Sequence, residues 1–209
     1  MPAANISLLF PTPILNTTIG REFTAAELDF CQAESQDLVQ NVGNMHSYDT
    51  YILNHPKMAD LKAICEEVVN TYIQNVLKPR DEVQAYITQS WLNYTKRGQH
   101  MHKHSHTNSF LSGVLYIHAE RDIDKITFHD REYRQICFPS SEYDGMNSES
   151  WWFPVGTGDI IVFPSETVHS VEPVEADEVR ISLAFNTFLN GTLGCKDRLT
   201  ELKIQNELS

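Results

Sequence analysis

The sequence predicts a mainly β fold, an antiparallel sandwich or barrel with helices on its outside. From residue 85 onward, apolar side chains recur at every second position in many short runs, and no helical pattern separates those runs. A parallel sheet needs a crossover helix between its strands, so this arrangement favours an antiparallel architecture. Strands are expected at residues 85–94, 110–118, 125–129, 159–163, 169–174 and 179–188.

The chain before residue 85 contains the expected helices. A weakly amphipathic pattern predicts one helix over residues 24–41, and a clearer pattern begins at Pro56 and ends before Pro79. Two more strands are expected, one at residues 6–14, where prolines suit a sheet edge, and one at residues 48–53. The helices are expected to support the outer face of the sheet.

Length and composition indicate a single globular domain. The 209 residues are expected to form one domain, with helical support over about 22–80 and a β core over about 85–190. The net charge of −12 makes a broad nucleic-acid-binding surface unfavourable, because such surfaces neutralise phosphates with clustered Lys and Arg. No apolar run has the length of a membrane span, and no signal peptide is evident. We therefore expect neither nucleic acid nor membrane as a partner.

The spacing of the four cysteines indicates the cellular redox environment of the protein. They are widely spaced and form no CxxC pair, which argues against both a zinc knuckle and a disulfide framework. We expect reduced thiols and a cytoplasmic location.

Four histidines alternate along the chain at positions 100, 102, 104 and 106. In an extended chain, residues i and i+2 point to the same side, so two of these imidazoles can meet one metal ion. The alternative is a solvated polar edge. Strict alternation directly before a strongly β segment favours a metal site, although the run alone selects neither the pair nor the metal.

A further histidine and an arginine follow in the second half of the chain. His169 comes just after an expected buried strand, where the chain reverses at the mouth of the predicted barrel, although it can equally be a turn residue. Arg180 shares a strand face with Ser182, Ala184 and Asn186, which are small or polar. This leaves room for an anion, and a guanidinium binds a carboxylate in a bidentate manner. The alternative for Arg180 is an internal salt bridge.

In order and spacing, these features resemble the 2-oxoglutarate- and Fe(II)-dependent dioxygenases, in particular a branch found in bacteria and cyanophages. The resemblance covers nearly the whole chain and implies a double-stranded β-helix, the jelly roll fold shared with cupins. It rests on residues 9–14 (LFPTPI), residues 91–93 (WLN), the pair His104-x-His106 leading into residues 110–116, residues 163–165 with His169, and residues 180–186.

The resemblance also implies the metal ligands. The family binds Fe(II) with a His-x-Asp or His-x-Glu pair and a distal histidine. By position, His104 and His106 correspond to the pair and His169 to the distal ligand. His106 stands where most members have a carboxylate, so His102 with His104 remains an alternative pair.

The cosubstrate site follows in the same way. In the family, the distal arginine binds the far carboxylate of 2-oxoglutarate, often with a neighbouring hydroxyl. This implies Arg180 with Ser182. Asn93 and Tyr116, on adjacent expected strands, are further candidates to hold the cosubstrate, with core packing as their alternative role. For Trp91 we expect packing alone.

The implied activity is hydroxylation of a substrate with molecular oxygen, Fe(II) and 2-oxoglutarate. Similarity to prolyl hydroxylases favours a peptide or protein side chain, while a small-molecule substrate stays open. Two rival functions share the fold: a cupin-like three-histidine dioxygenase or isomerase that uses no 2-oxoglutarate, and a non-catalytic β-helix binding module.

The segment 131–155 is long, polar and aromatic, without clear periodicity. We expect it to close over the pocket as a lid. The alternative is a surface insertion ordered by the partner in a homodimer.

Overall fold

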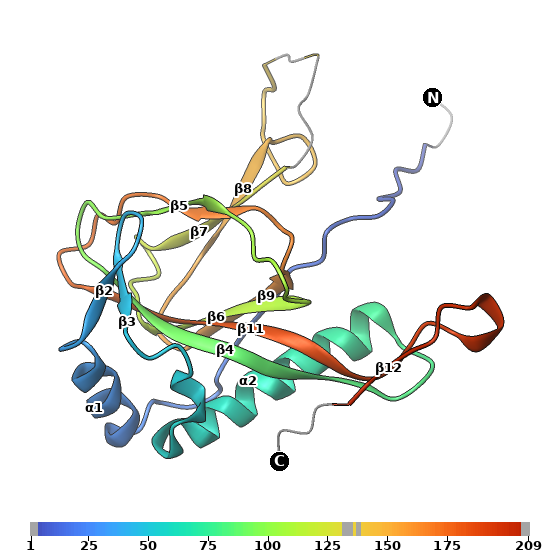
Figure 1. The fold of residues 1–209 in the computed structure, drawn as a ribbon. Helices are drawn as coiled ribbons and strands as arrows, with labels where there is room; N and C mark the ends of the chain where they lie inside the picture. The colour runs from blue at the N-terminus through green and yellow to red at the C-terminus, as the bar shows by residue number, and fades with distance from the viewer. Residues whose placement is uncertain (1–3, 131–135, 137–138, 206–209) are drawn as a thin grey trace.

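Two antiparallel sheets face each other in the computed structural model, which describes residues 4–130, 136 and 139–205 (Figure 1). The major sheet has the order β1-β9-β6-β11-β4-β3-β2 with β12 paired to β11, and the minor sheet has the order β5-β10-β7-β8. The strands are β1 (Leu15–Thr18), β2 (Leu38–Gln40), β3 (Met45–Ser47), β4 (Val83–Thr95), β5 (Met101–His104), β6 (Leu111–His118), β7 (Lys125–His129), β8 (Ser150–Pro154), β9 (Asp159–Pro164), β10 (His169–Val171), β11 (Arg180–Leu193) and β12 (Leu202–Ile204).

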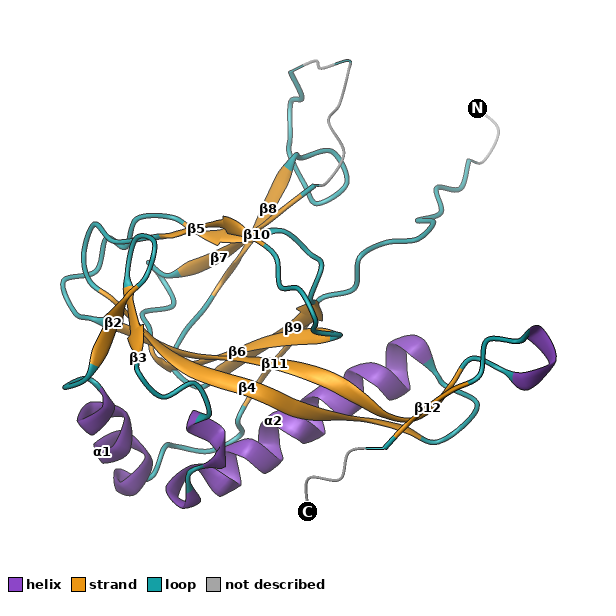
Figure 2. Cartoon of the chain, viewed as in Figure 1, coloured by secondary structure: helices purple, strands orange, loops and turns teal. Residues whose placement is uncertain are grey.

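The helices lie on the side of the major sheet that faces away from the minor sheet (Figure 2). They are α1 (Ala25–Glu34) and α2 (Ala59–Tyr72); α2 is preceded by 3-10 turns at Ile52–Asn54 and Pro56–Met58 and continues into a π-helical turn at Ile73–Leu77. A short 3-10 turn at Lys196–Arg198 precedes β12. None of the helices in the described ranges is long and apolar enough to cross a membrane.

Local sequence signals explain where α1 begins and where the π turn ends. The hydroxyl of Thr24 accepts a hydrogen bond from the Glu27 amide, and the Glu27 carboxylate accepts one from the Thr24 amide, which forms a capping box. Arg21 then pairs with the same carboxylate at 2.6 Å. Lys78, with φ 49°, adopts the left-handed conformation that ends the π turn one residue before Pro79.

Three expected elements before residue 85 were wrong in extent or type. The helix expected over 24–41 ends at Glu34, and the strand β2 follows within the same range. The strand expected at 48–53 is displaced to β3, and a 3-10 turn takes its second half. Residues 6–14 form no strand. Pairing starts at Leu15, because Pro11 and Pro13 have no N–H to give to the ladder.

The six strands expected after residue 85 are confirmed, with shifted ends. The strand expected at 169–174 stops at Val171, and that expected at 179–188 extends to Leu193. Two short strands of the minor sheet, β5 and β8, were not expected. Cys31, Cys65 and Cys195 are free thiols, and Cys137 lies outside the described residues.

Two apolar cores lie on opposite sides of the major sheet. The larger core packs between this sheet and the helices, and the smaller core fills part of the space between the two sheets. Strand β11 separates them by alternation, as the sequence predicts. Leu183 and Phe185 belong to the larger core, while Ser182 and Ala184 face the space between the sheets.

A β-bulge in β4 determines which of its residues face that space. Ile87 pairs with Thr187 and Gln89 pairs with Asn186, so Thr88 is an extra residue without a register partner. Before the bulge the odd-numbered residues of β4 join the helix-side core, and after it the even-numbered ones do. The bulge therefore leaves Gln89, Trp91 and Asn93 on the side of the minor sheet.

Close packing of Phe185 on Gly113 gives a test of this register. The two residues are cross-strand neighbours, and a Cβ on Gly113 would lie 2.1 Å from Cζ of Phe185, a fully buried ring. Gly113→Ala should lower the free energy of unfolding by about 1–3 kcal/mol, because the ring must move in a packed core. Urea unfolding of the purified protein measures this change.

Gly145→Ala is the matched control, since the nearest atom to its added Cβ is 3.9 Å away. It should change stability by less than about 0.5 kcal/mol. Phe185→Leu in the Gly113→Ala background should recover part of the loss, giving a favourable coupling in a double-mutant cycle. Equal stabilities of the Gly113 and Gly145 variants would contradict the register.

Candidate metal centre

Three imidazoles converge between the ends of β5 and β10. His169 on β10 is the direct cross-strand partner of His104 on β5, and His106 lies two residues beyond the end of β5. The ring centroids of His104 and His169 are 4.3 Å apart, and that of His106 is 5.2 Å from each of them. One ring nitrogen of each residue lies within 4.8 Å of the other two. The structure thus brings together the three histidines that the family resemblance implies as ligands.

Each of these rings donates its Nδ1 proton to an oxygen. The acceptors are the carbonyl oxygen of His102 at 2.7 Å for His104, Oδ1 of Asn186 at 2.5 Å for His106, and the carbonyl oxygen of Thr167 at 3.0 Å for His169. Because these oxygens only accept, the proton of each neutral ring lies on Nδ1, and its Nε2 keeps a lone pair. Metal-binding histidines are commonly held by such hydrogen bonds.

The spacing of the lone pairs fits a metal ion. Nε2 of His104 and Nε2 of His106 are 3.2 Å apart. With both protons on Nδ1, no hydrogen bond joins these two nitrogens, and their lone pairs repel each other. Two nitrogens at about 2.1 Å from one metal ion and at a right angle are separated by about 3 Å. A divalent cation would therefore replace a repulsion by two bonds.

Burial keeps the three imidazoles neutral. It lowers the pKa of His104 and His106, and it lowers the pKa of His169 to about 3, with the neighbouring imidazole of His104 acting in the same direction. Neutral imidazole is the form that binds metal, so the site is ready for a cation at pH 7.

The other two histidines of the alternating run lie outside the cluster. His102 is exposed and is not one of the three converging ligands; its ring lies 4.9 Å from that of His104, and its backbone oxygen accepts from Nδ1 of His104. His100 is exposed as well and lies against the backbone of Gly43. Strand β5 ends at His104, so the strict alternation of one strand does not extend to His106.

A cavity, here called the inner cavity, extends from the three histidines into the space between the sheets. Asn93, Tyr116, Ser182 and Arg180 line it. Ser182 on β11 is the cross-strand neighbour of Asn93 on β4 and of Tyr116 on β6. The four residues expected around the cosubstrate therefore border the same cavity as the histidines. Burial raises the pKa of Tyr116, which keeps its hydroxyl protonated.

Arg180 is a buried cation with incomplete pairing. Its side chain is 4% exposed, and within the described residues its Nε and Nη1 have no hydrogen-bond partner. Asp124, also buried, is the acid of the internal salt bridge considered from the sequence, but its Oδ1 lies 3.9 Å from Nη1. A buried guanidinium without hydrogen bonds is unfavourable by several kcal/mol, so this end of the cavity attracts an anion.

Sequence reasoning missed two residues of the site. The sequence predicts the strand face of Asn186 correctly. Its hydrogen bond with His106 could not be predicted, because it depends on how the loop after β5 lies against β11. Trp91 was expected to contribute packing alone. Its half-buried ring lies 5.9 Å from that of His106 and borders the inner cavity.

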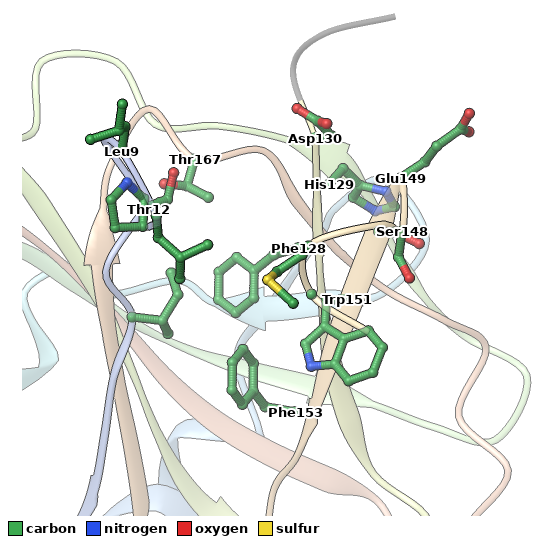
Figure 3. A pocket seen from close by; sticks show the side chains of 16 residues that line it. Leu9, Thr12, Phe128, His129, Asp130, Ser148, Glu149, Trp151, Phe153 and Thr167 are labelled. Atoms are coloured by element: carbon green, nitrogen blue, oxygen red, sulfur yellow. The ribbon is translucent and has the colours of Figure 1, made fainter. Parts of the chain in front are cut away.

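An apolar groove lies between residues 8–14 and the β7–β8 hairpin (Figure 3). Phe128, Trp151 and Phe153 form much of its floor, and no residue of the histidine cluster lines it.

Of the expected lid over 131–155, residues 131–135 and 137–138 lie outside the described residues, and residues 150–154 are the strand β8. The lid stays a prediction.

One segment of the chain matches a known family. Residues 89–186, which include all three clustered histidines and Arg180, match the family model described as "Putative 2OG-Fe(II) oxygenase". This segment is similar to the 2OG-Fe(II) oxygenases. A search of curated protein sequences found no match for the chain.

Solved structures share the fold of this chain. An oxidoreductase of the 2OG-Fe(II) oxygenase family from Burkholderia pseudomallei is 17% identical, with a TM-score of 0.55 over 84% of this chain and 83% of the other. HygX from Streptomyces hygroscopicus, crystallised with nickel, 2-oxoglutarate and hygromycin B, is 12% identical, with a TM-score of 0.54 over 84% and 82%. A prolyl-4-hydroxylase from Pseudomonas putida is 13% identical, with a TM-score of 0.53 over 84% and 92%. The predicted double-stranded β-helix is thereby confirmed.

Metal binding by single-histidine variants tests the cluster. His104→Ala and His169→Ala should each lose nearly all bound Fe(II) or Mn(II), because each change removes one of three protein ligands from an otherwise buried site. Metal content of the purified variants after dialysis measures the effect.

His102→Ala is the matched control on the same strand, since His102 is not one of the three converging ligands and its backbone oxygen remains in the variant. It should bind metal as the unmodified protein does. Loss of metal in His102→Ala together with retention in a variant of His106 would favour the alternative pair.

Proposed function

We propose that this oxygenase hydroxylates its substrate with Fe(II) held by His104, His106 and His169 and with 2-oxoglutarate held by Arg180. The observation that carries the proposal is the incompletely paired guanidinium of Arg180 in the cavity that begins at the histidine nitrogens. Fe(II) and 2-oxoglutarate, when bound, supply the oxidation of a C–H bond by molecular oxygen. The residues of the chain bind, orient and shelter the reactants.

Arg180 acts as the receptor for the far carboxylate of 2-oxoglutarate. Its Nε and Nη1 each have N–H groups to donate to an anion, and burial strengthens the pairing by excluding water. Ser182 and Tyr116, both on this cavity, supply hydroxyls for the same anion. The anion also relieves the long and incomplete contact between Arg180 and Asp124.

Asn186 and Ser112 act on His106, the ligand that replaces the usual carboxylate. Oδ1 of Asn186 accepts from Nδ1 of His106 and from Oγ of Ser112 at 2.9 Å, which holds the amide and thereby the ring. A third neutral ligand leaves the loaded metal with one more unit of positive charge than a carboxylate would. This excess charge favours the binding of a dianionic cosubstrate.

The rival without 2-oxoglutarate shares the three histidines but gives no role to a buried arginine. The non-catalytic rival gives no role to three imidazole nitrogens that lie within 4.8 Å of one another. Among proteins of the same fold, the prolyl hydroxylase of Trichoplax adhaerens was crystallised with a peptide fragment, and HygX with hygromycin B. Both a peptide and a small molecule are therefore open as substrate classes on the basis of fold.

Arg180→Met separates the favoured function from its rivals. The variant should keep its metal, while the dissociation constant for 2-oxoglutarate should rise roughly thirty-fold or more, because a charge-assisted bidentate pair in a sheltered site is lost. Calorimetry with Mn(II)-loaded protein measures the affinity, and conversion of 2-oxoglutarate to succinate with Fe(II) measures turnover.

Arg97→Met is the matched control, because Arg97 is a surface residue whose side chain is 64% exposed. It should bind 2-oxoglutarate as the unmodified protein does. Absence of 2-oxoglutarate binding by the unmodified, metal-loaded protein would support the cupin-like rival instead.

A further inference from the structure

A second cavity, here called the outer cavity, opens on the solvent side of His104 and His106. It is distinct from the inner cavity that reaches Arg180, yet both share His104, His106 and Trp91. A substrate that enters the outer cavity therefore reaches the metal ligands without passing the cosubstrate. This position suits the entrance of a substrate.

The wall of the outer cavity is polar, with four histidines (His46, His102, His104 and His106) and no permanently charged side chain. None of the described residues that line it is Asp, Glu, Lys or Arg, although 21% of the chain is charged. A cationic substrate would require a carboxylate here, and an anionic one would require Arg or Lys. The apolar groove of Figure 3, by contrast, has the lining for an apolar ligand but contains no metal ligand. The substrate that suits the outer cavity is neutral and forms hydrogen bonds.

Amides and hydroxyls supply the polar character. Oδ1 of Asn186 accepts two hydrogen bonds from within the protein, so its NH2 group remains as a donor. Gln89 is the cross-strand neighbour of Asn186, and its exposed amide makes no hydrogen bond among the described residues. Thr50 and Thr107 add hydroxyls to the same lining. These groups present donors and acceptors side by side, as vicinal hydroxyl groups also do.

Trp91 provides a flat surface at the junction of the two cavities. It follows Gln89 on the same face of β4, and its cross-strand neighbour on β11 is Ala184, whose side chain is too small to cover the indole. The indole face packs well on a face rich in C–H groups. A ring stacked there would hold its C–H bonds next to His106, whose ring lies 5.9 Å from that of Trp91.

We propose that the substrate of this oxygenase is a neutral carbohydrate whose pyranose ring stacks on Trp91 and whose hydroxyls bind Gln89 and Asn186. A pyranose combines the two properties that the outer cavity selects, a C–H face and a rim of neutral groups that both donate and accept. The proposal rests on the proposed function, since it takes the histidine cluster as the place of oxidation. It replaces the peptide side chain favoured by the sequence, which becomes an outcome of the test.

Saturation-transfer NMR with protein loaded with diamagnetic Zn(II) and 2-oxoglutarate tests the substrate class. The probes are the methyl pyranosides of glucose, galactose and mannose, the charged methyl glucuronoside, and the blocked peptide acetyl-Gly-Pro-Gly-amide. At least one neutral pyranoside should receive saturation on its ring protons, while the glucuronoside and the peptide should not. Gln89→Leu should weaken that binding about fivefold, the loss of roughly one neutral hydrogen bond.

Trp91→Leu should abolish the signal, and Trp152→Leu is the matched control. Trp152 is 51% exposed on β8 and outside the outer cavity, so its loss should leave pyranoside binding unchanged. Binding that survives Trp91→Leu, transfer to the peptide alone, or no transfer to any neutral pyranoside would each overturn the proposal. Calorimetry of metal and 2-oxoglutarate on the same samples keeps the two proposals apart: if both bind while no pyranoside does, the carbohydrate proposal alone fails.

Discussion

The ladder between β4 and β11 is the constraint on which the rest of the structure depends. It runs in one antiparallel register from Arg180 opposite Thr95 to Gly191 opposite Val83, interrupted only by the bulge. Because strand side chains alternate, the same register buries Leu183 and Phe185 against the helices and turns Arg180, Ser182 and Asn186 toward the minor sheet. The apolar core that stabilises the fold thereby also fixes the positions of the site residues.

The minor sheet completes what the ladder begins. Pairing of β5 with β10 brings His104 opposite His169, although the two residues are far apart in the chain. The loop after β5 then returns His106 to the major sheet, where Asn186 holds it. The candidate metal centre thus bridges the two sheets, and a cation bound there would join them as a cross-link.

Much of this arrangement follows from the sequence because it depends on local patterns. The strict alternation in residues 180–186 separates the core face from the polar face without any tertiary information. The alternating histidines and the arginine eleven positions after His169 agree in order with the oxygenase family. Helix α2 can be predicted because its apolar residues recur at helical spacing between Pro56 and Pro79.

The remaining features depend on contacts that no short window of sequence contains. The bulge at Thr88 reverses the two faces of β4, and a uniform period of two cannot reveal it. Whether His102 or His106 joins His104 depends on where β5 ends, and this is decided by pairing with β10. Asp124 approaches Arg180 only after β7 and β11 have taken their places in different sheets.

The protons on the three Nδ1 atoms have a consequence for the energetics of the whole chain. Folding has already placed them, so metal uptake at neutral pH releases few protons and reorients no ring. The free energy of the metal-free folded state is raised, because this state confines three desolvated lone pairs near one another. A cation that binds the folded chain and not the unfolded one stabilises it by mass action, so the melting temperature of the protein is coupled to the free metal concentration around it.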